Sequence, residues 1–379
     1  MIYLDNAATT PIHEDVLKEM LPYFDERYGN PSSLHKLGRE ANNALLLARK
    51  RIKDSINARE HKIVFTSGAT EANNLALKGV MHASKKKHLI VSSIEHESIL
   101  EPAKSLEREG YKVSYIPVDK YARIDLDKLE GMIDNDTALI SVMLVNNEVG
   151  TIEPLDDVIE LAHKHGIMVH SDIVQATGKM KVDVSKLDLV TLSAHKMYGP
   201  KGVGALCISE GVKIIPIIDG GGHEYNLRSG TQNVPAIVGI GKAFEISKIF
   251  DYNKVKELRD ILINRLLEIP NARLNGHPTH RVANNIHITF LGVNGEDLII
   301  KLSEKGVAAS TGSACSVNKQ KASHVLKAMN FSYEEITGSL RLTLGIQNTR
   351  EEIEKAGEII SDTVKELRSL SPYASKYLT

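Results

Sequence analysis

The most constraining feature of the sequence is an alternation, from about residue 60 to residue 210, of short β-branched runs with longer amphipathic segments. This alternation is typical of a largely parallel sheet with helices on both faces, because successive parallel strands need a crossover helix. It predicts a doubly wound α/β domain. The expected strands are residues 62–66, 88–92, 113–117, 138–145, 167–172, 187–193 and 203–209, and the helices between them include 71–83, 97–109 and 154–165.

The pattern changes after residue 250. A Gly-rich stretch at 220–222 and an expected helix at 234–249 are followed by a long polar helix, strands near 285–290 and 340–344, and a charged helix from Thr349. The length of 379 residues also exceeds the roughly 100–200 residues of one ordinary domain. We therefore predict a large α/β domain at residues 14–250 and a small α+β domain made of residues 1–13 and 251–379.

Charge and hydropathy argue against several classes of function. Lys plus Arg number 47 and Asp plus Glu 48, so no global field attracts the chain to nucleic acid. The longest apolar stretch, residues 138–145, is far shorter than the roughly 20 residues of a membrane-spanning helix. The chain starts directly in a strand-like pattern, without the segments of a signal peptide. We expect a cytoplasmic protein that binds neither membranes nor nucleic acid directly.

Two neighbouring expected strands end in polar residues that suit one cofactor. Lys196 follows the strand 187–193, in the sequence Ser-Ala-His-Lys-Met-Tyr-Gly-Pro-Lys-Gly, and Asp172 and Gln175 end or follow the strand 167–172. Ligands of open α/β sheets bind at this carboxyl edge. A buried carboxylate keeps a pyridine nitrogen protonated, so Asp172 together with Lys196 indicates pyridoxal phosphate. Taken singly, Lys196 is better explained by a solvated surface charge, and Asp172 by a cap of the next turn.

Residues 66–71, Thr-Ser-Gly-Ala-Thr-Glu, end a strand and begin a helix. The backbone N–H groups and the helix dipole at such a point bind a phosphate. Neither nucleotide motif, G-x-x-x-x-G-K-[ST] or G-x-G-x-x-G, follows a strand, which favours a single cofactor phosphate. The alternative is a plain helix start. His96 also follows a strand, where an imidazole can lie against a flat ring and move protons; the alternative is a structural histidine.

The two cysteines need separate explanations. Cys315 lies in Ala-Ser-Thr-Gly-Ser-Ala-Cys-Ser-Val-Asn, a stretch of small residues that predicts an exposed loop, and a thiol there is better explained by reactivity than by packing. Cys207 lies in an apolar run, which predicts burial. Arg341, inside a strand pattern, is suited to bind a carboxylate through two hydrogen bonds, with a structural ion pair as the alternative.

Taken together, these residues resemble one family, the cysteine desulfurases, which are pyridoxal-phosphate enzymes of fold type I in the class V aminotransferase group. The matching motifs occur in order along nearly the whole chain. They are YLDNAATTP at 3–11, YGNPSS at 28–33, Gly-Ala-Thr-Glu at 68–71, Glu95-His96, NNEVGT at 146–151, and the stretches 172–175, 193–202, 220–231, 312–315 and Arg341.

The resemblance implies a role for each candidate residue, with Lys196, His96 and Cys315 as the catalytic set. For the cofactor ring, it implies covalent attachment at Lys196, Asp172 at the ring nitrogen, Gln175 at the ring hydroxyl and His96 stacked on the ring. For the phosphate it implies contacts from Ala69, Thr70, Ser193 and His195. Thr231 would reach the phosphate of the neighbouring subunit, which implies a homodimer. Asn147 and Arg341 would hold the substrate carboxylate.

The implied reaction converts L-cysteine to L-alanine and leaves the sulfur on Cys315 as a persulfide. The Ser-Ala-Cys motif with a long following loop marks the branch that supplies iron–sulfur cluster assembly and tRNA thiolation, so the expected acceptor is an iron–sulfur scaffold protein. Whether Cys315 also ligates a cluster shared with that partner stays open, and no other metal ligand is expected. Two alternatives also stay open: a selenocysteine lyase or other class V enzyme, and a sulfur-relay scaffold activated by its partner.

Three positions depart from the pattern of the family. The sequence after Cys315 lacks the usual Leu-Glu/Asp-Pro before Ser-His, which bears on the conformation of the loop and on its acceptor. Tyr225-Asn226 stands where Arg-Gly is usual, which removes a positive charge near the cofactor entrance. Ile173 stands where Ala is usual, which predicts a tighter fit beside the ring.

Overall fold

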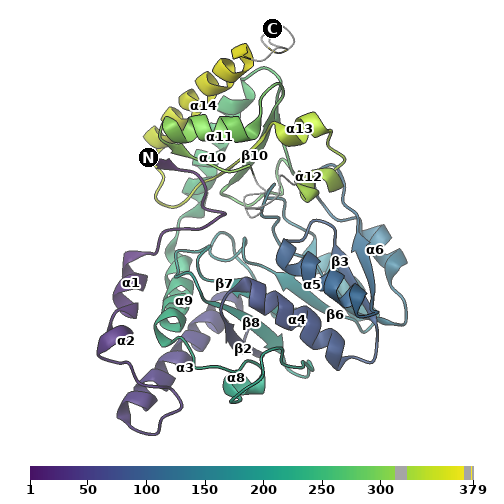
Figure 1. The fold of residues 1–379 in the computed structure, drawn as a ribbon, viewed down its shortest axis with the longest axis vertical. Helices are drawn as coiled ribbons and strands as arrows, with labels where there is room; N and C mark the ends of the chain where they lie inside the picture. Colours follow the sequence, from purple (N-terminus) through teal and green to yellow (C-terminus); the bar gives the residue numbers. More distant parts are fainter. Residues whose placement is uncertain (312–321, 371–376, 378–379) are drawn as a thin grey trace.

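The computed structural model describes residues 1–311, 322–370 and 377 (Figure 1). Its large sheet has seven strands in the order β2-β8-β7-β6-β5-β3-β4. All neighbours are parallel except β8, which runs antiparallel to both β2 and β7. The predicted, largely parallel sheet is confirmed. Its strands are β2 (His61–Thr66), β3 (His88–Ser92), β4 (Lys112–Ile116), β5 (Thr137–Ser141), β6 (Met168–Asp172), β7 (Leu189–Ser193) and β8 (Gly204–Ser209).

Strand β5 is shorter than the predicted residues 138–145 and ends at Ser141. The backbone N–H of Val142 still donates to the carbonyl oxygen of His170 at 3.1 Å. The next N–H, that of Met143, donates instead to the buried carboxylate of Glu95 at 2.6 Å. A side chain thus takes the place of a strand as the partner of Met143, while the backbone N–H of Leu144 still donates to the carbonyl oxygen of Asp172 in β6 at 3.1 Å.

Helices cover both faces of the large sheet, as predicted. Neighbouring residues of a strand point to opposite faces. Ile63 and Cys207 pack in the core that α3 and α9 cover, whereas Val64 and Leu206 pack in the core beneath α4 and α5. The helices of this part are α1 (Glu14–Met20), α2 (Pro22–Asp25), α3 (Lys36–Ile56), α4 (Ala69–Ala83), α5 (Glu97–Arg108), α6 (Leu126–Met132), α7 (Leu155–Lys164), α8 (His223–Asn226) and α9 (Val234–Ile246), followed by the 3-10 turn η1 (Ser247–Ile249).

A second, antiparallel sheet has the strand order β12-β10-β9 and packs in a separate core with α10, α11 and α14, which Figure 1 shows at the top of the molecule. None of the helices in the described part of the chain is long and apolar enough to cross a bilayer. The elements here are α10 (Tyr252–Leu267), β9 (Ala272–Leu274), β10 (Asn285–Phe290), α11 (Gly295–Glu304), β11 (Val307–Ala308), α12 (His324–Ala328), α13 (Tyr333–Thr337), β12 (Ser339–Thr343) and α14 (Arg350–Leu370).

The N-terminal strand β1 (Ile2–Tyr3) pairs in parallel with β11, so the chain begins against the smaller sheet. Ile2 and Leu4 belong to the same core as that sheet. In the other direction, Val325 of α12 and Ile336 of α13 pack against the core of the large sheet. The separate cores support the predicted division into residues 14–250 and residues 1–13 plus 251–379, which stays a prediction.

Candidate active site

Lys196 lies just after β7, and the N-terminal segment holds it in place. Its Nζ donates to the carbonyl oxygens of Ala7 at 2.7 Å and Ala8 at 2.6 Å. The backbone N–H and the hydroxyl of Thr10 both donate to the carbonyl oxygen of His195, at 2.9 and 3.0 Å. Lys196 is therefore a half-buried, hydrogen-bonded amine rather than the solvated surface charge of the alternative interpretation.

Asp172 ends β6 and is 8% exposed. One carboxylate oxygen accepts from the backbone N–H of Val174 at 3.0 Å, which is the turn cap that the alternative interpretation expects. The other accepts from the side-chain amide of Asn73 at 2.9 Å. Both donors are neutral, and within the described residues the carboxylate has no ion pair. A buried carboxylate in this setting favours a cationic ligand.

Gln175 connects these two residues. Its Nε2 donates to the carbonyl oxygen of Ala7 at 3.1 Å, the same oxygen that accepts from Lys196. Its Oε1 accepts from Nζ of Lys179 at 2.9 Å. The ends of β6 and β7 therefore bring Asp172, Gln175 and Lys196 together at the carboxyl edge, as predicted from the order of the strands.

The start of α4 offers room for an anion. Ala69 and Thr70 lie in its first turn, where backbone N–H groups have no partner inside the helix. A Cβ on the N-cap Gly68 would meet no atom within 4 Å, so the space in front of this turn is open. A Cβ on Gly204 would lie 2.7 Å from the backbone of Gly68, so β8 needs glycine there.

Ser193 and His195, the other two expected phosphate contacts, lie at the end of β7 and directly before Lys196. Ser193 is buried, at 1% exposure. Nδ1 of His195 lies 3.2 Å from the hydroxyl of Thr9. Burial, together with the nearby charge of Lys196, lowers the pKa of His195 to about 4. The imidazole is therefore neutral at pH 7 and acts on an anion through hydrogen bonding rather than charge.

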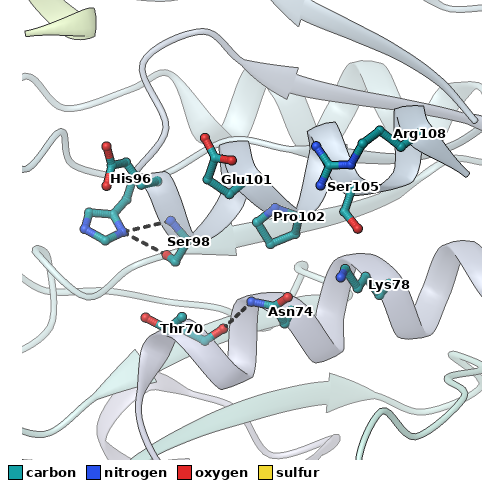
Figure 2. Close-up of a pocket in the computed structure, with 10 residues that line it drawn as sticks. Thr70, Asn74, Lys78, His96, Ser98, Glu101, Pro102, Ser105 and Arg108 are labelled. Carbon is teal, nitrogen blue, oxygen red and sulfur yellow. Dashed lines mark hydrogen bonds between the residues drawn. The ribbon is translucent and has the colours of Figure 1, made fainter. Parts of the chain in front are cut away.

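His96 is the N-cap of α5, as the structural alternative expects. Its Nδ1 accepts from the backbone N–H of Ser98 at 3.1 Å. Burial lowers the pKa of the ring, so the neutral form dominates, and its proton then lies on Nε2. A cavity of about 440 Å³ lies between α4 and α5. Figure 2 shows His96 and Thr70 at one end of it and Lys78 and Arg108 at the other.

Arg341 lies in β12 and is 3% exposed. Its Nη2 donates to Oδ1 of Asp5 at 3.0 Å, which is the ion pair of the alternative interpretation, and its Nη1 donates to the carbonyl oxygen of Asn147 at 3.0 Å. The structure thus brings Arg341 and Asn147 together, and both lie next to the N-terminal segment. The backbone of Ser310 also pairs with that of Arg341.

The remaining predicted residues are Thr231 and the two cysteines. Thr231 is exposed, in the stretch between α8 and α9. Cys315 lies outside the described residues. Cys207 is fully buried in β8, and burial raises the pKa of its thiol, which confirms the prediction that it packs in the core.

Two buried polar residues, Asn73 and Lys179, contact predicted site residues but were not themselves predicted from the sequence. Asn73 binds Asp172 and also donates to the hydroxyl of Ser98 at 2.8 Å. Its signal was an amide on the otherwise apolar face of α4. Lys179, which binds Gln175, is 3% exposed. No periodic pattern in the sequence indicated this contact, because the segment between Gln175 and Lys179 is a non-helical turn with Gly178 at a positive φ of 70°.

The donor set fits pyridoxal phosphate. A buried carboxylate, a neutral amide, an amine and an open helix N-terminus match the ring nitrogen, hydroxyl, aldehyde and phosphate of that cofactor. Ile173, which replaces the usual Ala, is fully buried next to Asp172.

Residues 2–356 match the family described as aminotransferase class-V. The chain is 48% identical over 382 residues to the cysteine desulfurase IscS of Methanosarcina thermophila. The aligned region covers 99% of this chain and 95% of that protein. Among solved structures, a NifS-like protein with 37% identity superimposes with a TM-score of 0.90, over 96% of this chain and 99% of that one. A structure described as SspA in complex with cysteine is 34% identical and superimposes with a TM-score of 0.82. The match covers 92% of this chain and 100% of that one.

Proposed function

Since this chain belongs to the class V aminotransferase family and is a cysteine desulfurase that depends on pyridoxal phosphate, we propose that Lys196 carries the cofactor and that Cys315 accepts the sulfur of L-cysteine. The observation that supports this assignment most directly is the shared acceptor at Ala7, which brings the amine of Lys196 beside the amide of Gln175, at the strand end next to Asp172.

Each residue then has a defined task toward the cofactor. Asp172 stabilises a protonated ring nitrogen, Gln175 donates to the ring hydroxyl oxygen, and His96 lies against the ring. The first turn of α4, with Ser193 and His195, binds the phosphate. When bound, pyridoxal phosphate supplies a sink for the electron pair released at the α-carbon of the substrate.

The amine of Lys196, when it is not bound to the cofactor, moves the proton of the substrate α-carbon as a general base. Arg341 and Asn147 hold the substrate carboxylate. Arg341 is already paired with Asp5, so the substrate carboxylate takes a place beside an existing ion pair. We propose that this arrangement orients the substrate rather than attracting it from solution.

Sulfur transfer follows from the chemistry of thiolates. The thiolate of Cys315 attacks the sulfur of the substrate, an S–S bond forms and the C–S bond breaks, and the electron pair of that bond returns to carbon, which takes up a proton. The products are L-alanine and a persulfide on Cys315. We propose that an iron–sulfur scaffold protein, and in tRNA thiolation a second acceptor, then receives this sulfur.

We also propose a homodimer in which Thr231 reaches the phosphate of the neighbouring subunit. Exposed apolar side chains in and around α1, α2 and α3 support an interface: Leu21 is 54% exposed, Phe24 63%, Tyr28 68% and Leu34 90%. Such a cluster of large exposed apolar residues is typical of a surface that another chain covers.

The test is the release of alanine and sulfide from L-cysteine in the presence of a thiol reductant. Wild type is expected to release both, and Cys315→Ala to release neither while still holding the cofactor. The matched control is Cys207→Ala, which removes the buried thiol and is expected to retain activity. Loss of activity in the control alone, or full activity in Cys315→Ala, would contradict the assignment. Activity that appears only with a scaffold protein would favour the partner-activated relay.

A further inference from the structure

Lys179 is a buried cation that the reaction described so far does not use. It lies in the turn after β6 and is 3% exposed. Burying an ammonium group costs several kcal/mol unless a carboxylate compensates it. In the described part of the chain its ammonium makes one hydrogen bond, at 2.9 Å to Oε1 of Gln175, and no ion pair. A methionine would fill this space without the cost, so packing alone does not explain the residue.

The turn itself places Lys179 against Gln175. The backbone N–H of Lys179 donates to the carbonyl oxygen of Ala176, and Gly178 takes a positive φ of 70°, which lets the chain curl back there. The two side chains therefore meet through backbone geometry, not through a chance contact of flexible ends.

The contact decides which way the amide of Gln175 points. A lysine amine donates hydrogen bonds, and in its protonated form it has no acceptor. The oxygen Oε1 must therefore face Lys179. At the other end, the carbonyl oxygen of Ala7 accepts from Nε2 at 3.1 Å, which requires the same orientation. A reversed amide would place donor against donor at one end and acceptor against acceptor at the other.

Charged groups surround Lys179 on both sides. Burial, then the charges of Lys196 and Arg341, lower its pKa to about 7. Lys179 also forms part of the wall of a cleft of about 550 Å³, which Lys181, Lys248, Lys256, Asp251 and Tyr252 line as well. Both protonation states of the amine keep N–H donors, so the contact with Gln175 persists across neutral pH.

We propose that Lys179 is a positioning residue for the cofactor: it fixes the amide of Gln175 so that Nε2, rather than Oε1, faces the ring hydroxyl oxygen of pyridoxal phosphate. This inference rests on the proposed role of Gln175 and goes beyond it, because it assigns the orientation to a residue that does not touch the cofactor. In its protonated form, Lys179 also places a positive charge behind that amide, which favours a deprotonated ring oxygen.

The test compares two ligands of the apo-protein by equilibrium dialysis: pyridoxal phosphate and 3-deoxypyridoxal phosphate, which lacks the ring hydroxyl. In Lys179→Met only the carbonyl oxygen of Ala7 still orients the amide of Gln175. We expect the affinity for pyridoxal phosphate to fall about 3- to 10-fold, the worth of one hydrogen bond, and the affinity for the deoxy ligand to stay within about 2-fold. Lys179→Arg, which keeps a donor, is expected to restore the preference.

Two controls separate the outcomes. Lys181→Met removes an exposed cation from the same cleft and is expected to change neither affinity. In a Gln175→Ala background, Lys179→Met is expected to lose its effect on the ligand preference, because the two residues act as one unit.

The pH midpoint of the absorbance of the bound cofactor provides a second readout and is expected to rise in Lys179→Met.

Equal losses for both ligands in Lys179→Met, or no loss for either, would overturn the inference and leave the proposed function intact. A wild type that binds neither ligand would overturn the cofactor assignment itself. Thermal unfolding of each apo variant, followed by circular dichroism, identifies any variant whose losses come from a failure to fold; if Lys179→Met is one of these, Lys179→Gln takes its place in the same comparison.

Discussion

Near the carboxyl edge of the large sheet, Glu95 and Glu153 are buried carboxyl groups that form no ion pair within the described residues. Glu95 and Glu153 are 0% and 3% exposed, and burial raises the pKa of each carboxyl group. Oε2 of Glu153 accepts from the backbone N–H of Ile124 at 2.9 Å, and among the described residues Oε1 has no hydrogen-bond partner. These groups make the stability of the protein depend on pH.

Glu153 gives a prediction with a definite sign. Burial raises its pKa from 4.5 to about 8 in the folded protein. Between these values the folded state holds a proton that the unfolded state has lost. Its contribution to stability is therefore fully present below about pH 4.5 and is lost as the pH rises through about 8. Glu153→Gln stays neutral, so the mutant should gain stability relative to wild type on going from pH 5 to pH 8, by on the order of a few kcal/mol.

Urea unfolding at pH 5, 6.5 and 8 measures this difference. The control is Glu354→Gln on the outer face of α14, whose side chain is 52% exposed, and its difference from wild type should not change with pH in this range. A Glu153→Gln variant whose stability relative to wild type is independent of pH would show that Glu153 is charged in the folded protein.

Lys196 is expected to determine the colour of the protein. Purified wild type should be yellow, from pyridoxal phosphate bound covalently to this amine, and Lys196→Ala should lose that absorbance. Lys186→Ala, which changes an exposed lysine between β6 and β7, should keep it. An absorption spectrum after incubation with added cofactor and gel filtration decides the point. A colourless wild type that takes up no cofactor would refute the assignment.

The sequence predicted the residues whose position follows from strand order. Asp172 and Lys196 end neighbouring strands, so their meeting followed from the pattern alone. Asn73 did not, because its contact with Asp172 depends on the rotation of α4 against the sheet. The covering of Lys196 by Ala7 and Ala8 also depends on a chain crossing from one core to the other, which no periodicity specifies.

At the scale of elements, the short helix α8 has a backbone conformation that needs an external anchor. Three consecutive residues, Glu224, Tyr225 and Asn226, have φ values of 47°, 63° and 63°. For residues other than glycine this conformation is strained. Tyr225-Asn226 replaces the Arg-Gly that is usual at these positions. In the family pattern the glycine removes part of the backbone strain, so the pattern did not indicate that this chain is strained here.

Arg49 of α3 supplies that anchor. Its Nη2 donates to both carboxylate oxygens of Glu224, at 2.8 and 3.0 Å, and its Nε donates to the hydroxyl of Tyr225 at 3.0 Å. The guanidinium also stacks on the ring of Phe65, 4.6 Å from its centroid. The backbone N–H of Phe65 donates to Glu224 at 2.8 Å, so the whole group is tied to β2.

Arg49→Met should therefore be strongly destabilising. It leaves the carboxylate of Glu224, whose side chain is 1% exposed, buried without its cation, and we expect the free energy of unfolding to fall by about 3–5 kcal/mol. The control, Arg350→Met, breaks an ion pair on α14 whose arginine side chain is 71% exposed, and should cost less than about 0.5 kcal/mol. Chemical unfolding followed by circular dichroism measures both. Equal effects would show that α8 does not depend on the anchor.

At the scale of the whole molecule, the N-terminal segment links the two cores. Residues 2–4 pack with the smaller sheet, whereas residues 7–10 bind Lys196, Gln175 and His195 at the edge of the larger one. Any movement of the smaller core relative to the larger would therefore change the surroundings of Lys196. Arg341, which binds Asp5 and Asn147, strengthens the same link.

The proposed dimer leads to a prediction about mixed subunits. Thr231 is exposed in the single chain, so Thr231→Glu should fold normally while its carboxylate repels the phosphate of the neighbouring site. Lys196→Ala should be inactive at its own site. Each variant alone should have little activity. In mixed dimers, one of the two sites combines an intact Lys196 with an intact Thr231 from the partner subunit, so an equimolar mixture should recover about one quarter of the wild-type activity.

The mixture is made by co-expressing the two variants with different tags and refolding them together, and alanine release from L-cysteine is measured. The control mixes Lys196→Ala with Asp172→Ala. Both of those residues belong to the site of their own subunit, so a mixed dimer has no complete site and activity should not return. Recovery in the control mixture as well would indicate exchange of whole segments between subunits. No recovery in either mixture would mean that Thr231 belongs to the site of its own subunit or that the protein is a monomer. Sedimentation velocity distinguishes these two explanations, because only the first retains the mass of a dimer.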